Sequence, residues 1–143
     1  MTAAERRNKM ASVSVRYIVD DVGAAIAFYC EQLDFQEVMH PAPTFAMLDR
    51  GEMRLVLSAP SSQGGGGQPM PDGTKPEPRG WNRFIIEVAD LADRVQVLRD
   101  RGAHFRNDIV EGVGGRQILV EDPAGNLIEL FEPSIPEARL AER

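Results

Sequence analysis

Two segments of the chain repeat one pattern of hydrophobic and polar positions. Strand-like alternation runs from Ser14 to Val19 and again from Arg83 to Val88. In each case apolar residues then follow at spacings of four and three, which is one face of an α-helix. A shift of 69 positions places Val19 on Val88. The pattern predicts an internal duplication in which each copy begins with a strand and a helix.

The ends of both expected helices carry recognisable signals. Asp21 and Asp90 stand in the N-cap position, where a carboxylate can accept a backbone N–H. Gly102 predicts the end of the second helix, because glycine adopts the left-handed backbone conformation at low cost. Asp34 lies near the equivalent place in the first copy, and aspartate tolerates that conformation better than most residues. The two helices are therefore expected to end in the same way.

Three short strand-like runs follow each helix, separated by turns that contain Gly, Asp or Pro. They span Phe35 to His40, Phe45 to Asp49 and Met53 to Ser58 in the first copy, and Phe105 to Val110, Arg116 to Glu121 and Leu127 to Phe131 in the second. Each copy is thus predicted to be a βαβββ module, and the fold class is α+β.

Residues 60–80 separate the copies and are dominated by Pro, Gly, Ser and Gln, with glycines at 64–67. This composition is typical of a flexible linker. A phosphate-binding loop is not favoured, because no Lys-Ser/Thr pair and no helix follow the glycines. We therefore predict a single domain at residues 12–133, between an N-terminal leader (1–11) and a C-terminal tail (134–143). Within the domain, module one spans 12–59, the linker 60–80 and module two 81–133.

Composition narrows the class of protein. The 143 residues are 43% hydrophobic and 27% charged, which is typical of a globular chain. A net charge of -6 argues against nucleic acid as a partner. No apolar run is long enough to span a bilayer, and the first residues lack the features of a secretory signal. With Cys30 as the single cysteine, no internal disulfide can form, and we expect a cytoplasmic protein that does not bind membranes.

Two motifs on this duplicated frame carry a family resemblance. They are the Asp-Asp-Val and Ala-Ile-Ala-Phe-Tyr stretches within residues 20–29, and Glu-Asp-Pro-Ala-Gly-Asn-Leu-Ile-Glu-Leu at residues 121–130. On these residues the chain resembles the vicinal oxygen chelate superfamily, which includes glyoxalase I, bleomycin-resistance proteins and extradiol dioxygenases. The resemblance covers roughly residues 12–133. It implies that the two modules curl their sheets into a cup for a small molecule, and that the protein is a homodimer.

Side chains of a strand alternate between its two faces, so each sheet is expected to have an apolar face under the helix and a mixed face. The mixed faces carry the charged residues Arg16, Arg54, Arg83, Glu87 and Glu129. On composition alone such a face is ordinary solvated sheet surface. The resemblance implies instead that the mixed faces line the cup.

The resemblance also identifies the positions at which related proteins bind a metal ion. Metal-dependent members of the superfamily take ligands from the first and last strands of each module, and the matching positions here are Ser14, Val56, Arg83 and Glu129. Only Glu129 is a usual ligand type, since valine has no donor atom and arginine is a permanent cation. One carboxylate does not hold a transition metal. We therefore expect no metal and no other cofactor.

Arg83 and Glu129 are expected to form an ion pair at this place, which would keep either charge from being buried alone. The pair could simply hold two strands together. Alternatively, the Arg83 guanidinium could grip an anionic group of a ligand bidentately, with Arg16 and Arg54 adding to the preference. Trp81 has two interpretations as well, because it could stack on a planar ligand or anchor the linker.

The expected ligand-binding set is Ser14, Arg16, Arg54, Val56, Trp81, Arg83, Glu87, Glu129 and Phe131. No catalytic residue is assigned: His40 and His104 lie at strand ends away from these positions, and Cys30 is interpreted as a packing residue. The first hypothesis is therefore a metal-free protein that binds or sequesters a planar or anionic small molecule. The alternative is a lyase, isomerase or dioxygenase of the same superfamily, either metal-dependent or using Glu129 in acid–base chemistry.

Overall fold

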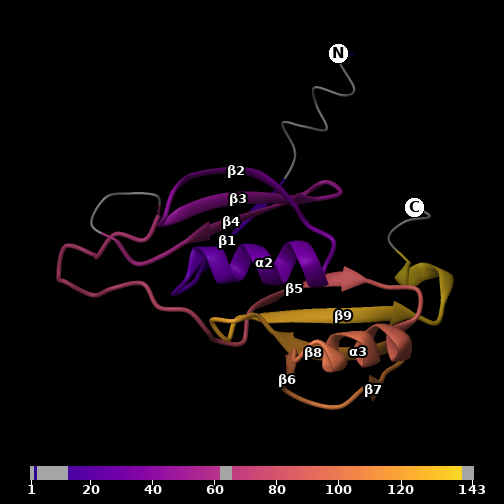
Figure 1. Cartoon of the computed structure of the whole chain (residues 1–143). Coiled ribbons are helices and arrows are strands. Elements are labelled where there is room, and N and C mark those ends of the chain that lie inside the picture. Colours follow the sequence, from indigo (N-terminus) through magenta and orange to yellow (C-terminus); the bar gives the residue numbers. More distant parts are fainter. Residues whose placement is uncertain (1, 3–12, 62–65, 140–143) are drawn as a thin grey trace. The chain divides into compact units, whose positions relative to one another are not determined.

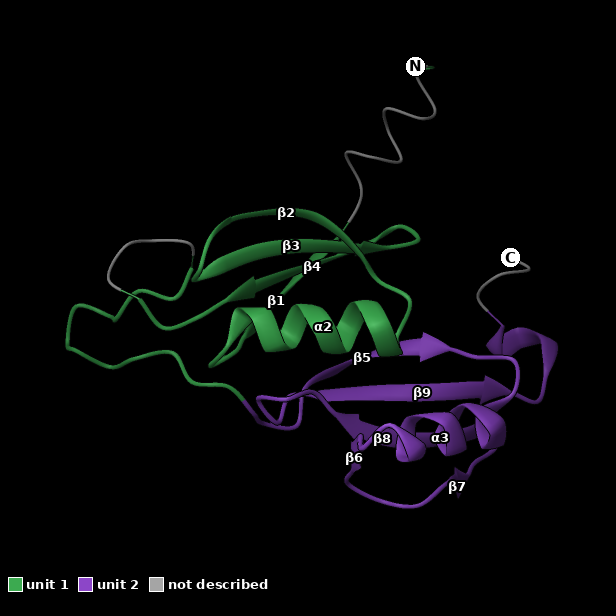
Figure 2. Ribbon diagram, viewed as in Figure 1, with its two compact units in different colours: residues 1–78 green, residues 79–143 purple. Residues whose placement is uncertain are grey.

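The computed structural model describes residue 2, residues 13–61 and residues 66–139. The chain divides into two compact units, Met1–Pro78 and Arg79–Arg143 (Figure 2). Within residues 13–61 and 66–139, each unit has one longer helix and its own sheet, in the same order along the chain (Figure 1). The α+β class and the duplicated strand–helix–strands pattern predicted from the sequence are confirmed.

The first unit begins with strand β1 (Ser14–Ile18) and helix α2 (Val22–Gln32). Strands β2 (Gln36–Ala42), β3 (Phe45–Arg50) and β4 (Met53–Ser58) complete it. The strand order in the sheet is β1-β4-β3-β2, with β1 parallel to β4 and the other neighbours antiparallel. The helix thus carries the chain from β1 to β2 at the opposite edge of the sheet, and the antiparallel strands β3 and β4 return until β4 lies beside β1.

The second unit repeats this order with strand β5 (Arg83–Glu87) and helix α3 (Leu91–Asp100). The strands that follow are β6 (His104–Phe105), β7 (Val110–Glu111), β8 (Gly115–Glu121) and β9 (Leu127–Pro133). A 3-10 turn, η1 (Pro136–Ala138), comes last. The sheet has the order β5-β9-β8-β6, β7 also pairs with β8, and β5 is parallel to β9.

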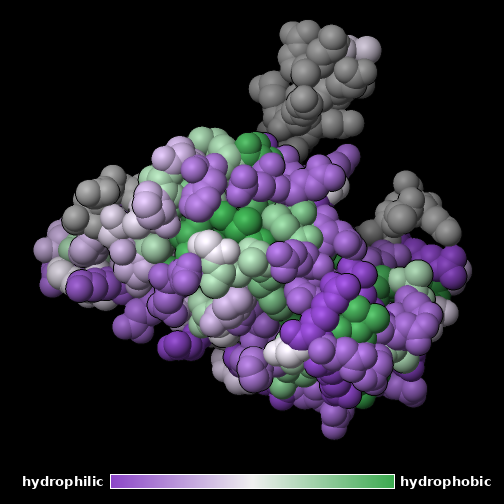
Figure 3. All heavy atoms as spheres, in the orientation of Figure 1, coloured by the Kyte–Doolittle hydropathy of each residue, from purple (hydrophilic) through white to green (hydrophobic). Residues whose placement is uncertain are grey.

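Each helix buries the apolar stripe that the sequence pattern indicates. In α2 the buried residues include Val22 and Tyr29, and the Tyr29 ring meets Phe35 edge to face at a centroid distance of 5.3 Å. In α3 the buried residues are Leu91, Val95 and Leu98. The polar positions between them face outward, and hydrophilic residues cover most of the visible surface over α3 (Figure 3). No helix in the described part of the chain is long and apolar enough to cross a membrane.

Of the four residues predicted to cap or end the helices, three act as the sequence predicts. Asp21 caps α2, because its Oδ1 accepts the Ala24 N–H at 3.0 Å. Asp34 and Gly102, just beyond the two helices, have φ values of 62° and 85°, so both left-handed positions are confirmed. Asp90 is the N-cap residue of α3, but its side chain makes no capping hydrogen bond. The N-terminal Leu91 N–H of α3 donates instead to Glu132 Oε1 at 2.7 Å, from the neighbouring strand β9.

One expected strand is wrong. The run from Phe105 to Val110 does not form a single strand; only its first residue lies in β6 and only its last in β7. The interruption follows from Asn107, whose side-chain Oδ1 accepts the Leu119 N–H of β8 at 2.9 Å. A side-chain oxygen there takes the hydrogen bond that a strand carbonyl would otherwise accept, and the ladder is broken.

Part of the expected linker lies outside the described residues, namely 62–65. Gly66 and Gly67 are described, and Gly67 is buried. The Ser61 N–H donates to the Gly67 carbonyl at 3.0 Å, and a side chain at 67 would collide with the Ala59 carbonyl. The glycine at 67 therefore permits a close backbone approach at the end of β4.

Candidate functional site

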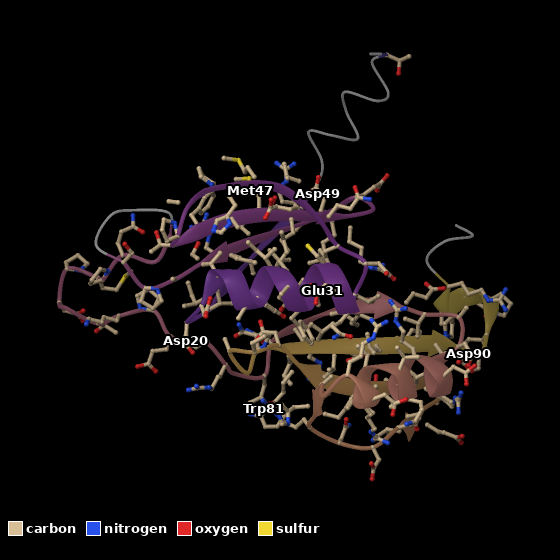
Figure 4. All side chains as sticks on the ribbon, viewed as in Figure 1. Asp20, Glu31, Met47, Asp49, Trp81 and Asp90 are labelled. Atoms are coloured by element: carbon tan, nitrogen blue, oxygen red, sulfur yellow. The ribbon has the colours of Figure 1, made fainter. Side chains whose placement is uncertain are left out.

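In the first unit the mixed face lies on the side of the sheet away from α2. Met47 and Asp49 of β3 point to that side (Figure 4). Asp49 and Arg54 face each other across β3 and β4, and the Arg54 Nε donates to Asp49 Oδ1 at 3.0 Å. Both side chains of this pair are about 40% exposed (40% and 39%), and the Asp49 carboxylate raises the pKa of Arg54 through its hydrogen bond and its charge. The Arg54 guanidinium group is thus already paired with a carboxylate of its own unit.

The other predicted residues of the first unit lie on the same face of the sheet. The strand register places Ser14 beside Arg54 and Arg16 beside Val56. Val56 is buried and Ser14 is exposed. Arg16 packs directly against Gly66, because a side chain at 66 would overlap its guanidinium group. Neither Ser14 nor Val56 has chemistry that would bind a metal ion.

In the second unit, three cross-strand rows define the mixed face of the sheet. They are Arg83–Leu127–Glu121, Ile85–Glu129–Leu119 and Glu87–Phe131–Gln117. The residues of this module that belong to the expected ligand-binding set therefore lie in these adjacent rows, with the exception of Trp81. Gln117, Leu119 and Glu121 belong to the same face but are absent from the set predicted from the sequence. These three residues could have been assigned to the mixed face from the sequence, because side chains alternate between the two faces along the strand from Arg116 to Glu121.

The structure brings Arg83 and Glu129 into direct contact, as the sequence hypothesis expected. Arg83 Nε and Nη2 donate to Glu129 Oε1 at 3.1 and 3.0 Å. The Glu129 side chain is 8% exposed and that of Arg83 is 29% exposed. The pairing keeps the largely buried carboxylate from standing without an opposite charge. The third donor, Arg83 Nη1, bonds the Trp81 carbonyl at 3.3 Å and so joins Trp81 to the pair.

The second carboxylate oxygen of Glu129 differs from the first. Both hydrogen bonds of the Glu129 side chain end on Oε1, and among the described residues Oε2 accepts none. Oε2 is not one of the fully buried side-chain atoms that lack a partner, so it is open to solvent. Oε2 is therefore an acceptor that remains available on the mixed face of the second unit.

Trp81 is held by a second arginine that sequence reasoning missed. The Arg106 guanidinium carbon lies 4.9 Å from the centroid of the Trp81 ring, within cation–π range. Glu121 fixes this arginine, since Arg106 Nη2 and Nε donate to Glu121 Oε1 at 2.7 and 2.9 Å. Trp81 nevertheless remains 67% exposed, and Figure 4 shows it in the segment that leads into β5. An ordered but exposed indole is a surface on which a planar molecule can stack.

The residues at the matched metal positions do not fit a metal centre. In the first unit they are serine and valine, and in the second unit the one carboxylate is engaged by Arg83. Among the described residues there is no group of three or more His, Cys, Asp or Glu side chains that could hold an ion. A transition metal needs three or four N, O or S donors, and a guanidinium group supplies none.

The remaining candidates lie apart from the mixed faces or are unreactive. Burial raises the pKa of the Cys30 thiol, and the carboxylates of Glu37 and Glu31 raise it further, so the reactive thiolate is disfavoured. His104 lines an open groove of about 420 Å³ at the β6 edge, together with residues that include Arg99 and Asp108. Arg99 in this groove is paired with Asp108 at 3.5 Å. These features do not assemble a nucleophile with a base.

The fold and the sequence together identify the family. The chain belongs to the Glyoxalase/Bleomycin resistance protein/Dioxygenase superfamily, whose family model matches residues 11–130. Among curated proteins, none matches the chain at a significant level.

The solved structures that are similar to it include the following three. A member of this superfamily from Sphaerobacter thermophilus is 25% identical, with a TM-score of 0.67 over 85% of this chain and 95% of that one. Lactoylglutathione lyase from Agrobacterium tumefaciens is 23% identical, with a TM-score of 0.65 over 85% and 92%. TnmS3, an antibiotic binding protein from a Streptomyces species, is 24% identical, with a TM-score of 0.64 over 85% and 93%.

Proposed function

We propose that this protein binds a planar small molecule without a metal ion, on the mixed face of the sheet in the second unit. The observation that carries the proposal is the contact of Arg83 with Glu129, at the positions that the resemblance matches to metal ligands. The guanidinium group supplies the positive charge next to the carboxylate that a metal would otherwise supply. A ligand at this face would therefore meet protein groups alone.

Trp81 supports the planar character of the ligand. Its backbone is bonded by Arg83 and its ring is contacted by Arg106, so the indole is positioned in advance of binding. Ordering a contact residue beforehand reduces the entropy lost on association. The arginines do not in themselves favour an anionic ligand, because Arg54 already pairs with Asp49 and Arg83 with Glu129.

An enzymatic role is the second candidate, and the burial of Glu129 is the observation in its favour. A carboxylate can act as a general base when it lies within hydrogen-bond reach of the proton that it removes. Arg83 already bonds Oε1, so Glu129 would have to act through Oε2. Because the similar structures include both a lyase and an antibiotic binding protein, the fold is compatible with either role.

The binding role can be tested with the protein stripped of metal by a chelator. Planar heteroaromatic compounds should raise its apparent melting temperature, because a ligand that binds only the folded state stabilises it by mass action. Trp81→Leu should lose this response, whereas replacement of the exposed Val113 by Ala should keep it. Turnover of such compounds by the chelated protein, abolished in Glu129→Gln, would favour the enzymatic role instead.

We also propose that the protein acts in the cytoplasm as a homodimer. The family resemblance supports the dimer, and the single Cys30 is compatible with a reducing compartment. Sedimentation at micromolar concentration distinguishes a dimer of about twice 15.8 kDa from a monomer. A monomer over the whole concentration range would contradict this part of the proposal.

A further inference from the structure

At the mixed face of the second unit, the guanidinium groups of Arg83 and Arg106 lie next to the carboxylates of Glu129 and Glu121. Each arginine is bonded to a carboxylate, Arg83 to Glu129 and Arg106 to Glu121. An incoming anion would have to compete with these internal carboxylates for the same donors, at a cost in both ion pairs.

The charged hydrogen-bonding group left on this face is an acceptor, while the neighbouring Gln117 amide can both donate and accept. Glu129 is 94% buried, with a relative exposure of 6%, and its Oε2 has no donor among the described residues. A carboxylate oxygen that is open to solvent beside a largely buried side chain can accept a donor that arrives with the ligand, and such a hydrogen bond is charge-assisted. The complementary group on a ligand is an N–H or O–H donor.

The backbone of the stacking residue Trp81 is linked to the same guanidinium group as this acceptor. Arg83 bonds both the Trp81 carbonyl and Glu129 Oε1, so a single guanidinium group spans the two residues. Arg106 contacts the Trp81 ring and is fixed by Glu121, which shares a cross-strand row with Arg83. A ring that stacks on Trp81 can therefore direct a short polar substituent towards Glu129.

We infer that the ligand is a planar aromatic molecule with an uncharged or cationic N–H donor group, such as an aromatic amide or amidine, and is not an aromatic acid. The inference rests on the proposed function and adds the chemical class of the ligand. Trp81 contacts the ring, and Glu129 Oε2 accepts the donor. Arg83 holds the carboxylate in place through Oε1, and this contact leaves Oε2 for the ligand.

Three probes with one ring system test this class: 2-naphthamidine, 2-naphthamide and 2-naphthoate, which are cationic, neutral and anionic. The chain has a single tryptophan, so the indole N–H resonance of Trp81 reports binding without ambiguity. We expect all binding to shift that resonance, with the amidine and the amide at least about tenfold tighter than the acid. Glu129→Gln should abolish most of the preference for the amidine, whereas Glu111→Gln, which removes one exposed carboxylate of the same unit, should leave it intact.

The outcomes separate this inference from the proposed function. If the acid binds as tightly as the amidine or more tightly, the inferred ligand class is wrong, while planar binding at Trp81 stands. If the preference survives in Glu129→Gln, Oε2 is not the acceptor and the inference is again wrong. If none of the three probes shifts the Trp81 resonance, the proposed binding site itself fails. The titrations of the unmodified protein decide the ligand class even if Glu129→Gln does not fold.

Discussion

Arg83 directs two N–H groups at one oxygen of Glu129, with Nε at 3.1 Å and Nη2 at 3.0 Å. The carboxylate is almost fully buried, whereas the pair between Arg54 and Asp49 in the other unit is about 40% exposed on both sides (40% and 39%). The two pairs have similar distances but different solvent screening. Their contributions to stability should therefore differ.

Replacing the arginine of each pair measures this difference. Arg83→Gln leaves the Glu129 carboxylate buried without its cation, and we expect the free energy of unfolding to fall by about 1–3 kcal/mol. Arg54→Gln should cost only about 0–1 kcal/mol, because water screens its exposed partner. Both values can be measured by urea denaturation. An equal decrease in the free energy of unfolding for the two variants would mean that Arg83 does not stabilise the buried Glu129 carboxylate.

The caps of α2 and α3 offer a second test. Asp21→Ala removes the bond to the Ala24 N–H and should cost about 1 kcal/mol. Asp90→Ala should cost less than about 0.5 kcal/mol, because Glu132 holds the first N–H of α3 instead. Urea denaturation of the two alanine variants, with Glu132→Gln as the matched variant for α3, measures these costs.

Asp90 also has a neighbour whose titration reports on it. Asp90 raises the pKa of Asp93 through a hydrogen bond and through its charge. In Asp90→Ala the pKa of Asp93 should fall back towards its ordinary value, which carboxyl NMR resonances measure. The raised pKa means that the Asp93 contribution to stability is present at acid pH and is lost as the pH rises through the raised value. A pKa of Asp93 that stays raised in Asp90→Ala would contradict this assignment.

Cys30 gives a prediction for pH dependence. Burial and the charges of Glu37 and Glu31 raise its pKa, so the folded protein should contain less thiolate at pH 8 than the unfolded chain. Alkylation by iodoacetamide should be slower in the folded protein, and its pH profile should shift to higher pH than in urea. Because the folded-state pKa is raised, this group stabilises the fold below the ordinary thiol pKa and loses that effect as the pH rises through the raised value. An unshifted profile would show that access alone limits the reaction.

Local patterns were sufficient to predict most of the fold. The spacing of apolar residues predicted both helices, and Asp34 and Gly102 marked their ends because left-handed backbone has a strong residue preference. The strand after α3 could not be predicted in the same way. Its interruption depends on Asn107 bonding the Leu119 N–H, a contact between residues of different elements. The cap of α3 has a similar origin, since Glu132 reaches Leu91 from β9.

The candidate site was predictable to the extent that strand alternation determines it. The face shared by Arg83 and Glu129 follows from alternation, and their contact follows from opposite charges in adjacent rows. Arg106 was missed because it follows β6 in an irregular segment, where alternation gives no direction to a side chain. Its contact with Trp81 depends on the position of Glu121 across the sheet edge.

The central claim is that ligand binding at Trp81 requires no metal ion. The most direct measurement is the dissociation constant of 2-naphthamidine, followed by the Trp81 indole resonance, before and after exhaustive chelation. We expect a saturable shift with the same dissociation constant in both preparations, since Arg83 pairs with Glu129 at the positions where the family resemblance implies metal ligands. Loss of binding on chelation, restored by added Zn²⁺ or Mn²⁺, would contradict it.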